Sequence, residues 1–471
     1  MSCINLLPKG AVKNAVTKVI RFLWGDLTPD ELKRFWRLST IFFVLIGVYW
    51  FIRVMKDPVF SLLVGYKYQP FAKIVSLFVV VGAVLLYSKL VDLLKKNVLF
   101  YLICSFFGLS FLGLGYVISH PGILSTATGS TLSSTFSFIP GSFLGWFIYC
   151  FIESFGSIVP ALFLAIVAST MSTELAKKGY GMIYAFGQLG VILGTGFVAS
   201  YVKTLGFGIL FAMGGIFIGI LPFLMKWYMT TSPIAIERQC SSSEQKPKTG
   251  ILEGLRLLLS RPYIAGLFVV TTMYEVIGTI VEFQMGLCAT ETYGVSAEGI
   301  ASFAWLKAMN GMSVGILSLA FALFGTSFLM RRLGLKFCII SYPTMIGITI
   351  ATIFGFYCAG ASLYFLMWAF FCAVVLFKGL SYTLNNPSKE VMYIPTSNDV
   401  KFKAKGWIDG FGSRAAKSTG ALVTGSLGAN LSALIVFGSV AALGIVAFWV
   451  FVAAYVGNTF NKLQAENKIV E

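Results

Sequence analysis

Residues 145–167 read GWFIYCFIESFGSIVPALFLAIV, and Glu153 is the one charge in this apolar run. About 20 apolar residues suffice for a helix to cross the roughly 30 Å hydrocarbon core of a bilayer. The run therefore predicts a transmembrane helix. An ionisable group at that depth costs roughly 2.5–3.5 kcal/mol on insertion scales, so Glu153 is a candidate for function. Glu153 needs a cation from another helix, and a purely structural salt bridge is the alternative to a role in gating.

The composition of the whole chain matches this segment. Hydrophobic residues make up 57% of the sequence and charged residues 12%, with a mean hydropathy of +0.84. Soluble proteins average about 25% charged residues, so an ordinary soluble domain is excluded. The basic residues behind the net charge of +17 alternate with the apolar runs. We therefore interpret the charge as a topological bias and not as a nucleic-acid surface.

Apolar runs of about 18 residues or more predict an all-α membrane protein with about twelve transmembrane helices. The predicted spans lie near 38–58, 71–91, 97–119, 138–171, 180–202, 206–228, 262–288, 299–330, 335–357, 360–386, 403–428 and 430–457. The eleventh span is interrupted by Asp409, Arg414 and Lys417.

Lysine and arginine occur before the first span and in alternate loops, as at 95–96, 177–178 and 331–332. By the positive-inside rule, both termini are expected in the cytoplasm. We expect no cleavable signal peptide, because the start of the chain is basic and amphipathic and lacks an A-x-A site.

The long polar stretch divides the spans into two groups of six. We expect a basic cytoplasmic segment at 1–37, six-helix halves at 38–229 and 261–458, a cytoplasmic linker at 230–260 and a cytoplasmic tail at 459–471. This 6+6 layout is typical of major-facilitator-type transporters, whose halves rock about a central site. A twelve-helix membrane protein of another fold is the alternative.

Further ionisable residues lie within the predicted spans or at their ends. FIRVMKDPVF at 51–60 places Arg53, Lys56 and Asp57 on one face of the first span, and Lys73 opens the second. Anchoring at the membrane interface is the alternative for these four residues. Charges inside later spans are Glu275 and Glu282 in the seventh, Lys307 in the eighth and Lys378 in the tenth.

Opposite charges in both halves suggest how the protein handles a polyanion. With no substrate bound, glutamates and lysines neutralise one another across a cavity. A phosphate-bearing substrate then competes for the lysines and arginines. Aromatic residues such as Tyr49, Trp50, Trp146 and Tyr149 are able to stack on a base, although packing in the bundle or against lipid is the commoner use of such side chains.

Residues 412–418, GSRAAKS, have the outline of a phosphate-binding loop with Ala416 at its second glycine. A functional loop of this kind follows a buried strand and opens a helix in a soluble α/β unit. Here it lies in a membrane segment. The chain also has a single histidine, His120, and no C-x-x-C pair. We therefore expect neither an enzyme nor a metal site.

Residues 385–421, NNPSKEVMYIPTSNDVKFKAKGWIDGFGSRAAKSTGA, resemble the nucleotide transporters (ATP/ADP translocases) of plastids and obligate intracellular bacteria. That family carries a stretch of the form S-L-F-D-P-x-K-E-x-x-Y-I-P, then K-x-K-x-K/A-x-x-I-D and a G-S-R-like run. FLWGDLTPDELKRF at 22–35 and the R-x-x-K-D pattern of the first span add to the resemblance. It extends over essentially the whole chain.

The resemblance implies a major-facilitator-like bundle that exchanges host ATP for ADP. It also implies that Lys73, Glu153, Glu282 and Lys389 are important for transport, because they occupy the charged positions that matter in the family. Three departures stand out. The family's F-D-P acid is an amide within 384–387, the residues after Glu282 lack the family's Trp and Lys, and the chain is somewhat short. We expect these departures to alter the choice of nucleotide and not transport itself.

We therefore expect an alternating-access antiporter of ATP against ADP, with phosphate, in the inner membrane of an intracellular bacterium. The expected substrate-binding residues are Lys73, Lys378, Lys389, Arg414, Arg53 and Lys56, and the expected charge partners in gating are Glu153, Glu282, Asp57 and Asp409. The expected partners are nucleotides and membrane lipid, with a monomeric chain, no nucleic acid and no cofactor. Three alternatives stay open: an exchanger of NAD or another non-adenine nucleotide, a nucleotide/proton symporter, and a receptor of transporter fold that does not transport.

Overall fold

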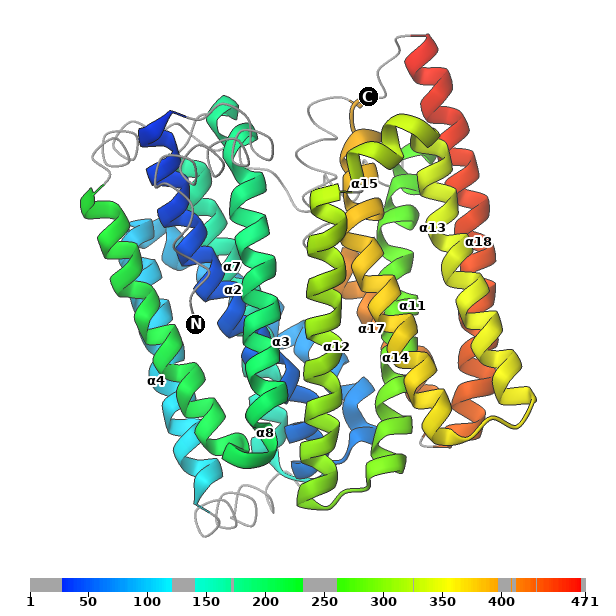
Figure 1. The fold of residues 1–471 in the computed structure, drawn as a ribbon, viewed down its shortest axis with the longest axis horizontal. Coiled ribbons are helices and arrows are strands. Elements are labelled where there is room, and N and C mark those ends of the chain that lie inside the picture. The colour runs from blue at the N-terminus through cyan, green and yellow to red at the C-terminus, as the bar shows by residue number, and fades with distance from the viewer. Residues whose placement is uncertain are drawn as a thin grey trace, which may run out of the picture.

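A computed structural model describes residues 28–120, 140–170, 173–231, 261–324, 326–396, 408, 412–428 and 430–466 of the chain. Its regular elements are helices, which stand side by side in two bundles (Figure 1). Ten of the described helices are long and apolar enough to cross a membrane. The prediction of an all-α multi-pass membrane protein is thus confirmed.

The described elements form two consecutive groups, which are called the two halves below. The first half holds α2 (Pro29–Leu63), η1 (Tyr66–Tyr68), α3 (Gln69–Leu93), α4 (Lys96–Ser119), α7 (Phe143–Thr170) and α8 (Thr173–Thr231). The second holds α11 (Pro262–Tyr293), α12 (Ala297–Phe324), α13 (Thr326–Cys358), α14 (Leu363–Leu380), η2 (Ser381–Asn385), α15 (Asn386–Met392), α17 (Ser413–Ser426) and α18 (Leu431–Ala465).

The long helix α8 contains both the fifth and the sixth predicted spans. Its backbone turns at Gly206, where φ is 72°. This left-handed conformation is easy for glycine and strained for residues with a Cβ atom, so a single residue reverses the chain between two spans. The predicted eleventh span corresponds in part to α17, while residues 403–407 and 409–411 lie outside the described part of the chain.

Several helix boundaries differ from the predicted spans. α2 begins at Pro29, well before residue 38, because Thr28 and Glu31 form a reciprocal capping box and proline is favoured in the first turn. The predicted span 299–330 is divided, since α12 ends at Phe324 and α13 begins at Thr326. The predicted span 360–386 is interrupted after Leu380 by the π-helical turn η2, a distortion that often marks functional sites.

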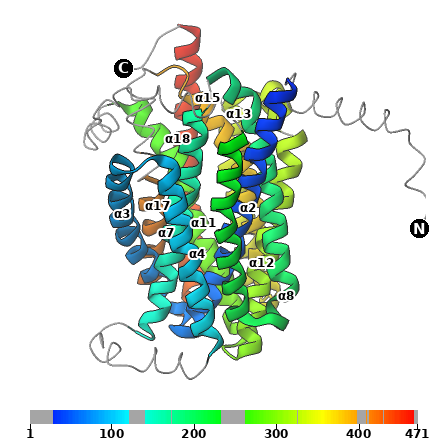
Figure 2. The ribbon, with the colours of Figure 1, turned by 90° about the vertical axis from the view of Figure 1, so that its left-hand side faces the viewer.

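Each half has its own hydrophobic core, and the two halves also pack on each other. One large buried cluster is built almost wholly from α2 to α8 and the other from α11 to α18. Contacts between the halves join α12 to α8 and α2 on one side and α17 to α3 on the other. Figure 2 shows α3 at the outside of the molecule, beside α7 and α17. Helices of both halves therefore surround a shared centre.

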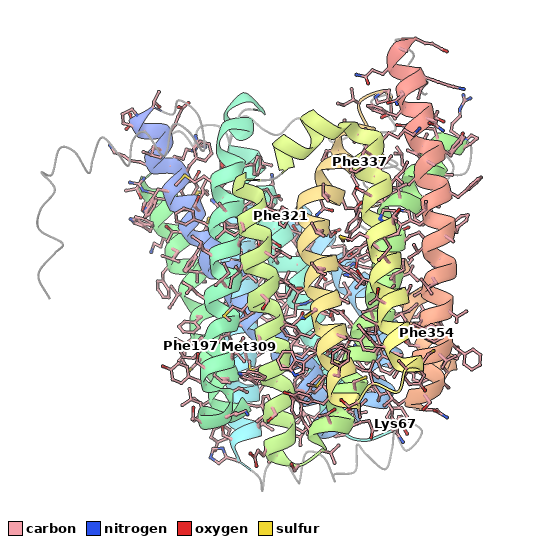
Figure 3. The ribbon with its side chains drawn as sticks, turned by 45° about the vertical axis from the view of Figure 1, so that its right-hand side comes forward. Lys67, Phe197, Met309, Phe321, Phe337 and Phe354 are labelled. Carbon is pink, nitrogen blue, oxygen red and sulfur yellow. The ribbon has the colours of Figure 1, made fainter. Side chains whose placement is uncertain are left out.

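The outer surface is apolar, as a lipid-facing surface requires. Large hydrophobic side chains such as Phe78, Phe223 and Phe451 are about 70% exposed. Figure 3 shows side chains covering the outside of the helices and places Lys67 of η1 at the end of the bundle opposite the C-terminal end of α18. The first residues of α2 and the last of α18 lie at one common end (Figure 1).

Candidate functional site

A cavity of about 590 Å³ lies between the two halves. Helices α2, α3 and α7 line it from the first half, and α11, α12, α14, α15 and α17 from the second. A volume of this size is typical of sites for one small molecule. Its lining is unusual for a membrane-embedded region, because twelve charged residues from the described part of the chain face it.

Cations outnumber carboxylates on the cavity wall. The described lining residues include eight cations, Arg53, Lys56, Lys73, Lys307, Lys378, Lys389, Arg414 and Lys417. They include four carboxylates, Asp57, Glu153, Glu275 and Glu282. The formal excess of four positive charges favours an anionic occupant over a neutral or cationic one.

Two ion pairs occupy matching places in the two halves. In the first half, Lys56 of α2 donates to Glu153 of α7. In the second, Lys378 of α14 donates to Glu282 of α11. Each pair joins the first and fourth spans of its half, with the lysine on the first span in one half and on the fourth in the other. Glu153 and Glu282 keep 27% and 22% of their side-chain surface exposed toward the cavity, so an incoming anion is able to reach these pairs.

A third ion pair connects the two halves directly. Lys307 Nζ on α12 lies 2.8 Å from Asp57 Oδ2 on α2. Asp57 lies in the last third of α2, toward the end where η1 follows, and only 14% of its side chain is exposed. The pair therefore ties the halves together near the end of the bundle that carries η1.

Tyr66 of η1 reinforces this connection. Its ring is 3% exposed and belongs to the core of the second half, where it stacks on Phe283 with centroids 5.4 Å apart and meets Phe303 edge-on at 5.2 Å. The Tyr66 hydroxyl donates to the Glu282 carbonyl oxygen at 3.5 Å. Phe283 and Phe303 form a socket for the Tyr66 ring. The ring fits there because residue 286 is glycine: a Cβ atom at this position would lie too close to the ring.

The remaining charges lie on the other walls of the cavity. Lys417 of α17 lies 3.6 Å from Glu275 of α11, which also accepts a hydrogen bond from Ser413 at 3.2 Å. Lys73 and Arg414 have no carboxylate within 4.0 Å among the described residues. These two cations, one from each half, are the most readily available to an anion.

Three aromatic side chains line the cavity among the residues that the structure describes: Tyr49, Trp50 and Tyr274. The Arg53 guanidinium carbon lies 5.5 Å from the Tyr49 ring centroid and 5.4 Å from that of Trp50, within the range of cation–π attraction. Two other predicted base-stacking candidates do not line it. Tyr149 is fully buried under Lys56, and Trp146 donates to the Pro140 carbonyl oxygen.

The structure brings nearly all of the predicted site residues together. Nine of the ten line the cavity described above, and Asp409 lies outside the described part of the chain. The predicted set lacks Glu275, Lys307 and Lys417, which line the same cavity. The same signal, a charge within an apolar run, identifies all three. Tyr274 has no such signal, because aromatic residues are common throughout the spans.

Comparison with known proteins relates the chain to carriers. The family model for the TLC ATP/ADP transporter matches residues 10–460. ADP,ATP carrier protein 2, chloroplastic, of Arabidopsis thaliana is 25% identical over 93% of this chain and 76% of its own length. ADP,ATP carrier protein 3 of Rickettsia bellii is 23% identical over 96% of this chain and 99% of its own length.

Solved structures support the fold. The nucleoside transporter NupG superposes with a TM-score of 0.58 at 14% identity, covering 91% of this chain and 99% of its own. A bacterial homologue of the iron transporter ferroportin in an inward-facing state superposes with a TM-score of 0.57 at 12% identity, covering 92% and 100%. Both likenesses confirm the major-facilitator-like arrangement of the helices.

Proposed function

Because this chain belongs to the TLC ATP/ADP transporter family, we propose that it carries adenine nucleotides by alternating access and exchanges ATP against ADP. The observation that carries this proposal is the central cavity, where cations of both halves converge and exceed the carboxylates by four. The Rickettsia relatives favour the inner membrane of an intracellular bacterium as its location.

The two matching ion pairs supply a means of sensing substrate. A phosphate oxygen makes the same charge-assisted hydrogen bonds to a lysine as a glutamate does. An entering nucleotide therefore displaces Glu153 from Lys56 and Glu282 from Lys378. Lys73 and Arg414 attract the phosphates first, because neither has a carboxylate within 4.0 Å among the described residues. Lys389, which lines the cavity from α15, adds a further cation.

The described conformation is closed at one end of the cavity. The Asp57–Lys307 pair and the seated Tyr66 join the halves at the end that carries η1. The ribbons of the halves diverge toward the end where α2 begins and α18 finishes (Figure 1). By the positive-inside rule this second end faces the cytoplasm, so we assign the conformation as open to the cytoplasm.

Exchanging the charges of the Asp57–Lys307 pair tests whether this contact closes the cavity at the η1 end. Asp57→Lys is expected to lower exchange about tenfold, because it sets a cation against Lys307 at the contact between the halves. Adding Lys307→Asp restores an attractive pair and should recover part of the loss. Exchange is measured with labelled ADP in proteoliposomes. If the loss of exchange rate in the double variant equalled the product of the two single losses, Asp57 and Lys307 would not form a direct closing contact.

Uptake of labelled ATP by cells that make the protein tests the function itself. We expect accumulated label to leave when ADP is added outside, and to stay when buffer alone is added. ATP carries about four negative charges and ADP about three, so 100 mV biases a one-for-one exchange by roughly 2.3 kcal/mol. A diffusion potential set with potassium and valinomycin should therefore change the rate, unless phosphate accompanies ADP and balances the charge.

The same uptake assay distinguishes the alternative functions: another nucleotide specificity, symport and a receptor without transport. Competition by NAD, GTP, UTP or CTP as strong as that by ADP would favour a carrier of broader or different specificity. Efflux without any external nucleotide, driven by a proton gradient, would favour symport. Binding without uptake would favour a receptor.

A further inference from the structure

The carboxylates that line the cavity from the described part of the chain are all engaged with lysines. Asp57, Glu153, Glu275 and Glu282 each have a lysine nitrogen within 4.0 Å, from Lys307, Lys56, Lys417 and Lys378 respectively. Carboxylate oxygens are the protein ligands that Mg²⁺ prefers. With no nucleotide bound, a magnesium ion would have to compete with a lysine for any one of them.

The charge balance of the cavity opposes a cation for the same reason. Eight cations against four carboxylates leave four positive charges among the described lining residues. The metal-free triphosphate brings about four negative charges, whereas its magnesium complex brings about two and places a divalent cation among lysines of the same sign. No group of three His, Cys, Asp or Glu residues able to hold a metal occurs in the described part of the chain.

The donors of the cavity fit bare phosphate oxygens. Lysine and arginine nitrogens donate hydrogen bonds and ligate no metal at neutral pH. Magnesium occupies phosphate oxygens and keeps several water molecules in an octahedral shell. It therefore blocks the oxygens that Lys73, Lys378 and Arg414 are placed to bind, and it adds bulk in a space of about 590 Å³.

We propose that the cavity accepts the metal-free polyphosphate anion and rejects the magnesium complex of the same nucleotide. This inference rests on the proposed function, because it takes a nucleotide to be the occupant. It adds the chemical form of the substrate: the cations of the protein take the place that magnesium holds in most nucleotide-binding enzymes.

Titrating magnesium at constant total ATP and constant ionic strength tests the inference. In proteoliposomes, the initial uptake rate is expected to follow the concentration of metal-free ATP, and to fall at least tenfold once magnesium is in large excess. Uptake that is unchanged or faster with magnesium would overturn the inference and leave the proposed function standing. Absence of uptake in both conditions would contradict the function and the inference together.

Magnesium leaves ATP quickly, so a magnesium titration always contains some metal-free ATP; a complex that does not exchange its metal avoids this problem. Tetraammine cobalt(III) ATP does not release its metal during the assay, so it should fail to compete with labelled ATP at concentrations where metal-free ATP competes fully. Equal competition by the two would overturn the inference. A rise in melting temperature of the detergent-solubilised protein with magnesium chloride alone would also overturn it, because it would reveal a cation site.

A single isosteric substitution changes the net charge of the residues that line the cavity. Asn386 of α15 is exposed and lines the cavity one turn before Lys389. Asn386→Asp adds an acidic ligand without changing size and should reduce the preference for metal-free ATP at least threefold. Asn386→Ser is the matched neutral control and should keep the preference. Equal preferences in the two variants would contradict the role assigned to cavity charge.

Discussion

Replacing Lys378 by glutamine is expected to lower ATP/ADP exchange at least a hundredfold. The substitution removes a cation that lines the cavity and leaves Glu282 without its lysine at 22% side-chain exposure. Breaking a fully buried pair by removing one partner costs roughly 3–5 kcal/mol, and partial exposure reduces that figure here. A hundredfold loss corresponds to about 2.7 kcal/mol of transition-state stabilisation. We therefore expect both the stability and the exchange rate to fall in Lys378→Gln.

The double variant separates the two effects. Lys378→Gln with Glu282→Gln leaves no unpaired charge, so the melting temperature should return close to that of the unmodified protein. Exchange should stay low, because the phosphates still lack one cation. Lys462→Gln, an exposed lysine near the end of α18, is the matched control and should change neither quantity. If the double variant exchanged nucleotides at the original rate, the Lys378–Glu282 pair would be a structural contact alone.

Substituting Gly286 by alanine is also expected to lower ATP/ADP exchange at least a hundredfold, although this glycine is not among the residues that line the cavity. The new methyl group would occupy the space of the Tyr66 ring, which is held between Phe283 and Phe303. Because the interior is tightly packed, the ring has to leave its socket. Without a seated Tyr66 the halves cannot close at the η1 end, and alternating access requires that closure. ATP binding, followed by thermal stabilisation, should persist.

Non-additivity tests this explanation. Tyr66→Ala alone also leaves the ring's place empty and should lower exchange to the same extent as Gly286→Ala, and Gly286→Ala should add no further loss in that background. Gly444→Ala in α18, where an added Cβ atom meets no atom within 4 Å, is the matched control and should be neutral. An active Gly286→Ala protein would show that the seated Tyr66 is dispensable.

The membrane class and most of the spans follow from the sequence alone. Both depend on local composition: an uninterrupted apolar run of about 20 residues is long enough to cross the bilayer by itself, whatever its neighbours do. The eleventh predicted span, which charges interrupt, corresponds only in part to the 14-residue helix α17. The sequence also identifies the candidate residues individually. A charge within such a run, as at Glu153, Glu282 or Lys378, is costly wherever the helix packs, so its functional significance is readable before any contact is known.

The pairings among these charges were decided only by the tertiary structure. Lys56 and Glu153 are 97 residues apart, and Lys378 and Glu282 are 96 apart, so no local pattern relates them. The contact of Asp57 with Lys307 and the seat of Tyr66 against Gly286 require the two halves to meet. Helix periodicity determines the face on which a residue lies, but the rotation and spacing of packed helices depend on side-chain packing over the whole bundle. The sequence thus determined which charges are buried, and packing determined which of them meet.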